Sequence, residues 1–200
     1  RGTEAKNLPV IVKPHGGPRA RDYLAWDIWA QFFADRGYLV IQPNFRGSTG
    51  YGEAFERAGL GEWGLTMQDD VDDALAWAVA EGLACVVGGS YGGYVAMRAA
   101  QRNPDLYRCA ISFAGVSSLP DMMRQDQSSF FGRYARDYWK GQADDLKGVS
   151  PVNYPEQFGI PLLLVHGKED LRVPVDHSRK MYAALQKAGK PVRYVEQPKN

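Results

Sequence analysis

Short apolar runs alternate along this chain with longer segments whose apolar positions recur at the spacing of a helix. Each run has the length of a strand and is apolar throughout, which is typical of parallel strands covered on both faces. The runs predict strands at Leu8–His15, Tyr38–Phe45, Ala84–Gly89, Cys109–Gly115 and Pro161–Gly167, and a last strand that begins at Pro191.

The longer segments between these runs predict helices. Glycines stop the first and the last of them, and acidic residues occupy the first turn of the second, as the helix dipole prefers. The segments are Ala25–Gly37, Gln68–Gly82, Ser90–Asn103 and Val175–Gly189. Regular alternation of strand and helix predicts an α/β fold, with a mostly parallel sheet and helices on both faces. Gly47–Gly64 and Ser117–Ser150 are predicted as loops.

Composition narrows the class of protein. The chain has 200 residues, of which 44% are hydrophobic, and this suits one domain with a sizeable core. The formal net charge is +1, so the charge balance does not indicate nucleic acid or an anionic membrane as a partner. No apolar run approaches the roughly 20 residues of a membrane span, and no signal peptide is expected. A cytoplasmic location is favoured, and the formation of a homo-oligomer is left as an open alternative.

Two cysteines, Cys85 and Cys109, each stand at or near the start of an apolar run. Buried, separate structural thiols are the prediction, with a disulfide or a nucleophilic role as alternatives. Neither spacing suits a metal site, so no metal is expected.

One corner of the sequence carries candidate chemistry. Gly88-Gly89-Ser90-Tyr91-Gly92 fits the pattern G-x-S-x-G between a predicted strand and a predicted helix. In that context a sharp turn holds a serine nucleophile at the carboxyl end of the sheet, and the N–H of Tyr91 could donate to an oxyanion. The alternatives are a turn needed only for packing, or a phosphate cradle, although the Lys-Ser/Thr of a phosphate loop is absent.

A serine nucleophile needs a base and an acid that orients the base. Asp170 is the acid candidate because it lies in the loop after the strand Pro161–Gly167, with Glu169 as alternative and a simple turn acid as the other reading. After such a turn the expected order is serine, acid, histidine. His15 and His166 precede Asp170, and His177 falls in the first turn of a helix, where a surface position is expected. The base is therefore expected a few residues beyond Asn200.

The loop HGGP, His15–Pro18, follows the first predicted strand. Paired glycines let the backbone turn an N–H inward without a side chain in the way. Such loops supply a second oxyanion donor, here the N–H of Gly17, with Gly16 as alternative. A plain β-turn at the end of a strand is the other reading.

Several motifs in order resemble the catalytic domain of the prolyl oligopeptidase family of serine peptidases, and within it the acylaminoacyl-peptidase and dipeptidyl-aminopeptidase-like branch. They are HGGP, QPNFRGSTGYGEAF, MQDDVDDA, GGSYGGY, SPVNY and HGKEDLRVP. The resemblance implies an α/β-hydrolase fold over the chain and short peptides as substrate. It also implies Ser90 as nucleophile, Asp170 as triad acid, the N–H groups of Gly17 and Tyr91 as oxyanion hole, and no metal or cofactor.

The resemblance also implies parts that this sequence does not contain. Relatives carry an N-terminal β-propeller that screens substrates by size, and a histidine that completes the triad. The near absence of a turn between Gly82 and Ala84 suggests that a few residues are missing there. Two other functions stay open: a carboxylesterase on the same fold, and a non-catalytic interaction module.

Supporting roles are expected for a few further residues. Val116, Met122 and Met123 follow a predicted strand and could line the substrate pocket, although ordinary core packing is the competing reading. Arg46 could pair with Asp69 or Asp70 and fasten its loop to the next helix. Aromatic residues of the two loops could contact a substrate or the propeller: Tyr51, Phe55, Phe130, Phe131, Tyr134, Tyr138 and Trp139.

Overall fold

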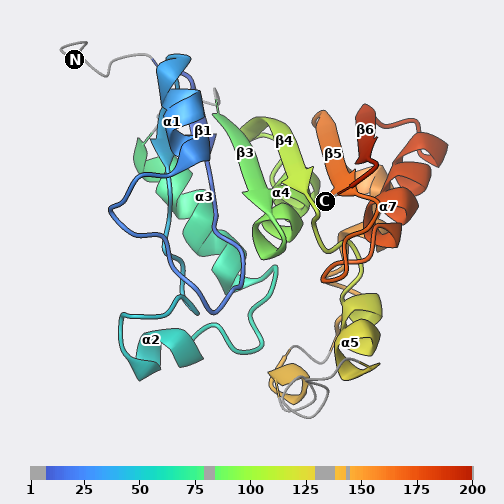
Figure 1. The fold of residues 1–200 in the computed structure, drawn as a ribbon, viewed down its shortest axis with the longest axis horizontal. Helices are drawn as coiled ribbons and strands as arrows, with labels where there is room; N and C mark the ends of the chain where they lie inside the picture. The colour runs from blue at the N-terminus through green and yellow to red at the C-terminus, as the bar shows by residue number, and fades with distance from the viewer. Residues whose placement is uncertain (1–7, 79–83, 129–137, 143–144, 200) are drawn as a thin grey trace.

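A single parallel sheet organises the chain in the computed structural model, which describes residues 8–78, 84–128, 138–142 and 145–199 (Figure 1). Its strand order is β2-β1-β3-β4-β5-β6, and every neighbouring pair is parallel. The strands are β1 Val10–Val12, β2 Leu39–Ile41, β3 Ala84–Gly89, β4 Tyr107–Phe113, β5 Leu162–Gly167 and β6 Val192–Gln197. Each lies within or overlaps a predicted apolar run, so the predicted parallel sheet is confirmed.

Helices connect the strands. Their bounds are α1 Ile28–Asp35, α2 Glu53–Arg57, α3 Thr66–Ala78, α4 Tyr91–Arg102, α5 Leu119–Ser128 and α7 Asp176–Lys187, with 3-10 turns at Pro151–Asn153 and Pro155–Gln157. The predictions of α1, α3, α4 and α7 are confirmed, whereas α2 and α5 fall in stretches predicted as loops. The helix α5 could not be recognised in the sequence because most of its positions are polar. Only Leu119, Met122 and Asp126 of this helix are buried.

The sheet has helices on both faces. Successive side chains of a strand point to opposite faces of the sheet. The last two residues of β4 therefore show which helix covers each face. Ser112 lies against Gly93 of α4, where a Cβ on that glycine would come 2.8 Å from the serine Oγ. Phe113 instead meets Trp29 of α1, with ring centroids 5.0 Å apart. The predicted arrangement is therefore confirmed.

The two helices differ in burial. Every residue of α4 except Arg102 is buried, because this helix packs against β3 and β4 and has α3 beside it (Figure 1). No residue of α1 is buried, and its large side chains Ile28, Trp29 and Phe32 are 43–63% exposed. The amphipathic helix predicted over Ala25–Gly37 thus forms, but much of its apolar side is open in the part of the chain that the structure describes.

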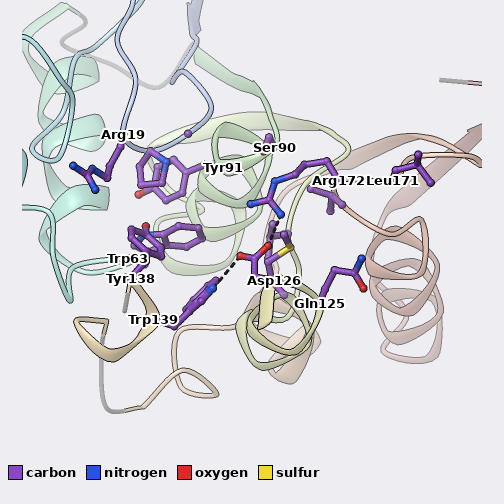
Figure 2. Close-up of a pocket in the computed structure, with 15 residues that line it drawn as sticks. Arg19, Trp63, Ser90, Tyr91, Gln125, Asp126, Tyr138, Trp139, Leu171 and Arg172 are labelled. Carbon is purple, nitrogen blue, oxygen red and sulfur yellow. Dashed lines mark hydrogen bonds and ion pairs between the residues drawn. The ribbon is translucent and has the colours of Figure 1, made fainter. Parts of the chain in front are cut away.

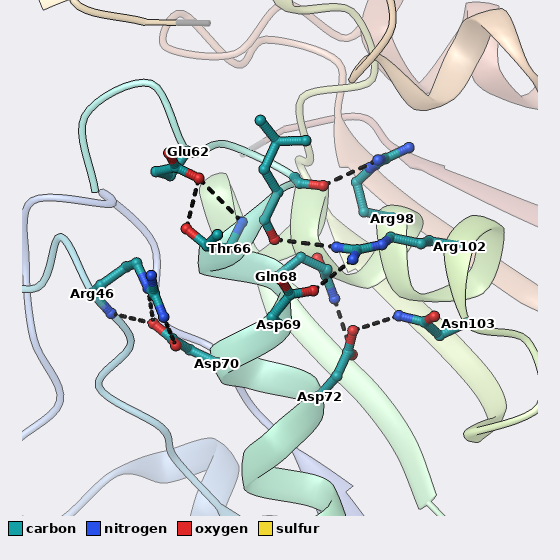
Figure 3. Close-up of polar contacts among 12 residues, drawn as sticks. Arg46, Glu62, Thr66, Gln68, Asp69, Asp70, Asp72, Arg98, Arg102 and Asn103 are labelled. Atoms are coloured by element: carbon teal, nitrogen blue, oxygen red, sulfur yellow. Dashed lines mark hydrogen bonds and ion pairs between the residues drawn. The ribbon is translucent and has the colours of Figure 1, made fainter. Parts of the chain in front are cut away.

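Polar contacts fasten α3 to its neighbours (Figure 3). Arg46 donates from Nε and Nη2 to the two carboxylate oxygens of Asp70, at 2.7 and 2.6 Å, and its backbone N–H donates to the same carboxylate. The predicted pairing of Arg46 is confirmed, with Asp70 as the partner. Asp69 instead accepts from Arg102 of α4 at 2.6 Å. The loop after β2 and the helix after Ser90 are therefore both tied to α3.

The prediction of two separate thiols is wrong. Cys85 and Cys109 are register partners on β3 and β4, and they form a disulfide across a Cα–Cα distance of 4.7 Å. The spacing of the cysteines along the chain could not show this, because it depends on which strands become neighbours in the sheet.

The described helices include none that is both long enough and apolar enough to span a membrane.

Candidate active site

Ser90 occupies the turn between the end of β3 and the start of α4. Its φ is 55° and its ψ is −118°, a positive-φ conformation outside the left-handed helical region that is strained for a residue with a Cβ. Its N–H donates to the Phe113 carbonyl at 2.9 Å, and its side chain makes no capping hydrogen bond to the helix that follows. The hydroxyl is therefore presented at the carboxyl edge of the sheet, as a nucleophile elbow requires.

Glycines on either side make this turn sterically feasible. A Cβ on Gly88 would lie 2.4 Å from the backbone of Gly92. A Cβ on Gly92 would lie 2.3 Å from the Pro14 carbonyl oxygen. Real side chains never come so close, so strand, helix and the loop after β1 meet at the distance of bare backbones.

The HGGP loop lies directly beside Ser90. A Cβ on Gly16 would stand 3.5 Å from the Cβ of Ser90. Gly17 has a φ of +125°, a backbone conformation in which a side chain would be strained, and the peptide bond from Gly17 to Pro18 is cis. The two glycines therefore bring main-chain groups, and no side chain, next to the serine.

A cavity of about 480 Å³ opens between these segments (Figure 2). Of the residues predicted for the site, Gly17, Ser90, Tyr91, Val116 and Met122 line it. Met123 does not line it and packs, half-buried, against the core.

Other aromatic and charged residues complete the cavity. Tyr138 and Trp139 were expected from the sequence as possible substrate contacts, whereas Trp63, Asp126 and Arg172 were not assigned to a site. Trp63 donates from Nε1 to the Tyr138 hydroxyl at 2.9 Å, and Trp139 donates from Nε1 to the Asp126 carboxylate at 2.9 Å. Arg172 forms an ion pair with the same carboxylate, and Figure 2 shows its guanidinium between Ser90 and Asp126. Only the aromatic content of the second loop hinted at part of this wall.

Two other aromatic residues noted in the loops, Tyr51 and Phe55, do not line this cavity. Tyr51 and Phe55 contact one another, with ring centroids 5.3 Å apart. Phe130, Phe131 and Tyr134 lie outside the residues that the structure describes, as does the joint after Gly82.

Asp170 lies in the loop after β5, where the sequence predicted it. Its Oδ1 accepts from the N–H groups of Arg172 and Val173 at 2.8 and 2.9 Å, so one oxygen shapes the turn. Its Oδ2 lies 3.7 Å from His166 Nε2, and the side chain is 21% exposed. The same loop contributes Leu171, Arg172 and Val173 to the cavity that Ser90 lines.

His166 has a structural setting. It is 1% exposed, its Nε2 donates to the Val173 carbonyl at 2.8 Å, and its Nδ1 lies 2.7 Å from the Ser178 hydroxyl. Both ring nitrogens are thus engaged inside the protein, and the ring holds the loop that carries Asp170.

His177 is buried, so the predicted surface position is wrong. It is 4% exposed, and its Nδ1 accepts from the N–H groups of Ser117 and Ser118 at 3.2 and 3.4 Å. The first turn of α7 packs against the loop after β4, a non-local contact that the helical pattern could not reveal. Burial lowers the pKa of His177 to about 4, and protonated Nδ1 would face two N–H donors.

This burial predicts a loss of stability in acid. Between pH 6.5 and about 4 the unfolded chain binds a proton at His177 that the folded chain does not. The free energy of unfolding should therefore fall by about 3 kcal/mol as pH drops through that window. His177→Asn keeps an acceptor for the two N–H groups and does not titrate. Thermal unfolding from pH 7.5 to 4.5 should show a shallower decline in this variant, and an identical decline would contradict the prediction.

The chain that leaves β6 emerges beside the Asp170 loop. Gly167 of β5 is the register partner of Gln197, and the Lys168 N–H donates to the Gln197 carbonyl at 2.8 Å. Lys168 is two residues before Asp170. The residues that follow Gln197 therefore begin beside the Asp170 loop.

The sheet order and the serine turn define an α/β-hydrolase fold, and solved structures agree. An acylaminoacyl peptidase in complex with Z-Gly-Gly-Phe-chloromethyl ketone superposes with a TM-score of 0.89 at 29% identity, over 100% of this chain and 34% of that one. The family model "Prolyl oligopeptidase family" matches residues 25–200. The chain belongs to the prolyl oligopeptidase family.

Curated relatives agree with this membership. Dipeptidyl aminopeptidase BIII of Pseudoxanthomonas mexicana is 36% identical over 94% of this chain and 29% of its own length. The acylamino-acid-releasing enzyme of Sus scrofa is 29% identical over 98% of this chain and 29% of its own length. The chain thus spans less than a third of the length of each of these two curated relatives.

Proposed function

We propose that this chain is the catalytic part of a serine peptidase that hydrolyses short peptides through an acyl-enzyme on Ser90. The observation that carries the proposal is the strained turn that sets Ser90 at the wall of a cavity of about 480 Å³, beside the Gly16–Gly17 backbone. Strain of this kind at a cleft is kept where it serves chemistry. The names of the relatives, which are peptidases, support the same class of reaction.

The reaction begins with attack of the Ser90 Oγ on the scissile carbonyl carbon. A base takes the hydroxyl proton, and the negative charge that develops on the carbonyl oxygen is met by the N–H groups of Gly17 and Tyr91. Collapse of this intermediate breaks the C–N bond, the base returns its proton to the leaving amine, and an ester remains on Ser90. Water then attacks the ester by the same route and frees the serine.

The proposal includes a histidine base a few residues beyond Asn200, oriented by Asp170. Its support is the register of β6, which starts the following residues next to the Asp170 loop. The three histidines within the chain are engaged elsewhere: His15 in the HGGP loop, His166 under the Asp170 loop, and His177 against the loop after β4.

The proposal also includes a preference for apolar or aromatic residues before the scissile bond. Val116, Met122 and the rings of Trp63 and Trp139 present apolar surface to the cavity. The similar acylaminoacyl peptidase was solved with a chloromethyl ketone that ends in Phe, which fits this preference. In the full-length protein we infer an N-terminal β-propeller that restricts substrates by size.

The test compares two substrate types on the full-length protein. We expect kcat/KM to be measurable for aminoacyl p-nitroanilides as well as for p-nitrophenyl esters, with Phe before the scissile bond preferred over Asp. A fluorophosphonate probe should label Ser90. Ester turnover without any amide turnover would identify a carboxylesterase instead. No labelling and no turnover would identify a non-catalytic module.

A further inference from the structure

His15, the first residue of the HGGP loop, is held by contacts that the proposed reaction does not use. The side chain is buried, and its ring stacks on Phe45 with centroids 4.3 Å apart and an interplanar angle of 18°. Its Nδ1 lies 2.8 Å from the Gly16 carbonyl oxygen, and its Nε2 lies 2.8 Å from the Ser48 hydroxyl.

These contacts assign the proton on the ring. A carbonyl oxygen only accepts hydrogen bonds, so the contact to Gly16 requires a proton on Nδ1. In the neutral ring Nε2 is then an acceptor. The Ser48 hydroxyl lies 2.8 Å from Nε2 and 2.6 Å from the Phe45 carbonyl oxygen, and its one proton can serve the ring because that carbonyl also accepts from the Ser48 N–H. Burial lowers the pKa of His15 below its usual value, which keeps the ring neutral at pH 7.

The second contact is anchored from outside the loop. Ser48 is fully buried, and its N–H donates to the Phe45 carbonyl at 3.0 Å. Two residues earlier in the same segment, Arg46 is fixed to Asp70 of α3. His15 therefore links the HGGP loop to a part of the protein that is itself held in place.

The Gly16 carbonyl and the Gly17 N–H belong to one peptide unit. In a planar trans peptide the two groups point in opposite directions, so fixing the carbonyl also fixes the N–H. Without such a restraint this unit could rotate easily, because both of its residues are glycines. A hydrogen bond to the carbonyl also polarises the peptide and strengthens its N–H as a donor.

We propose that His15 is a positioning residue, whose Nδ1–H holds the Gly16 carbonyl and so orients the Gly17 N–H towards the oxyanion. The inference rests on the proposed function, in which that N–H stabilises the intermediate on Ser90. It acts on the transition state rather than on substrate binding. Loss of the hydrogen bond should therefore lower kcat and leave KM unchanged.

Variants of His15 separate this role from packing. In His15→Asn the amide nitrogen takes the place of Nδ1 and can still donate to the Gly16 carbonyl. In His15→Gln the amide reaches instead towards Ser48, and His15→Phe keeps the stacking on Phe45 with no donor. We expect His15→Gln and His15→Phe to lose about 10- to 100-fold in kcat, less than loss of an entire oxyanion donor, and His15→Asn to stay within about fivefold.

The experiment measures kcat and KM of the full-length protein on a Phe p-nitroanilide, and inhibition by a peptidyl boronic acid. The boronate oxygen occupies the position of the oxyanion, so its Ki should rise by the same factor as kcat/KM falls. A product-like peptide should bind all variants equally.

Several outcomes would overturn the inference. They are an unchanged kcat in His15→Phe, a loss confined to KM, and equal losses in His15→Asn and His15→Gln. If His15→Phe does not fold, the comparison of the Asn and Gln variants decides alone. Failure of the proposed function is separate, because the wild-type protein would then show neither turnover nor labelling by fluorophosphonate.

Discussion

Replacement of Ser90 by alanine should abolish turnover in the full-length protein while leaving the fold intact. Loss of the nucleophile of a serine hydrolase lowers kcat by roughly 10⁴- to 10⁶-fold, because the remaining groups can only stabilise direct attack by water. Alanine keeps the Cβ and hence the same backbone conformation at φ 55°. The Ser90 side chain makes no capping hydrogen bond, so stability should change by less than about 0.5 kcal/mol.

The measurement combines p-nitroanilide turnover, fluorophosphonate labelling and thermal unfolding. Ser128→Ala is a matched control, since this exposed serine bonds only to the Gln125 carbonyl at 2.8 Å among the contacts described and does not line the Ser90 cavity. It should keep its rate and its label. Full turnover by Ser90→Ala, or labelling of another serine in that variant, would remove Ser90 from the mechanism.

Replacement of Gly92 by alanine should damage both stability and activity. The new Cβ would lie 2.3 Å from the Pro14 carbonyl oxygen and 3.3 Å from the His15 carbonyl oxygen. Both neighbours are backbone, so either α4 or the loop after β1 must move, and overpacking of this kind costs about 2–4 kcal/mol. Movement of that loop would also displace Gly17 from Ser90. We therefore expect a lower melting temperature and a lower kcat.

Gly89→Ala provides the matched control for stability. A Cβ there would first meet the Phe113 carbonyl oxygen at 3.7 Å, which is ordinary van der Waals contact. Its melting temperature should stay close to that of the wild type. Gly92→Ala could instead melt at the wild-type temperature, or both variants could lose the same stability. In either case the close approach of α4 and the HGGP loop is not the reason why position 92 requires glycine.

Most of the fold could be predicted because the local pattern of apolar and polar residues indicates which segments are buried. The runs at Ala84–Gly89 and Pro161–Gly167 are apolar throughout, and they became β3 and β5 of a parallel sheet. Gly-x-Ser-x-Gly between a strand and a helix placed Ser90 at its turn for a steric reason that the short distances around Gly88 and Gly92 bear out. The pairing of Arg46 with an acidic residue at the start of α3 was also predicted, and the structure selects Asp70 rather than Asp69.

The site was only partly predictable. Val116 and Met122 could be placed in the cavity because they follow a strand that ends at the same edge as Ser90. Trp63 and Trp139 come from segments far apart in the sequence, and the ion pair of Arg172 with Asp126 joins the loop after β5 to α5. No periodicity marks such contacts, and α5 carried too few apolar positions to be recognised as the helix that supplies Met122 and Asp126.

By itself the sequence determined the class of fold, the strained serine turn and the glycine loop beside it, because each depends on backbone sterics and burial within a short segment. Only the tertiary structure decided which strands are neighbours, and with that the disulfide between Cys85 and Cys109. It also decided that His177 is buried and that His15 holds the Gly16 carbonyl. The reason is that packing between distant segments sets these contacts, and packing is a property of the whole chain.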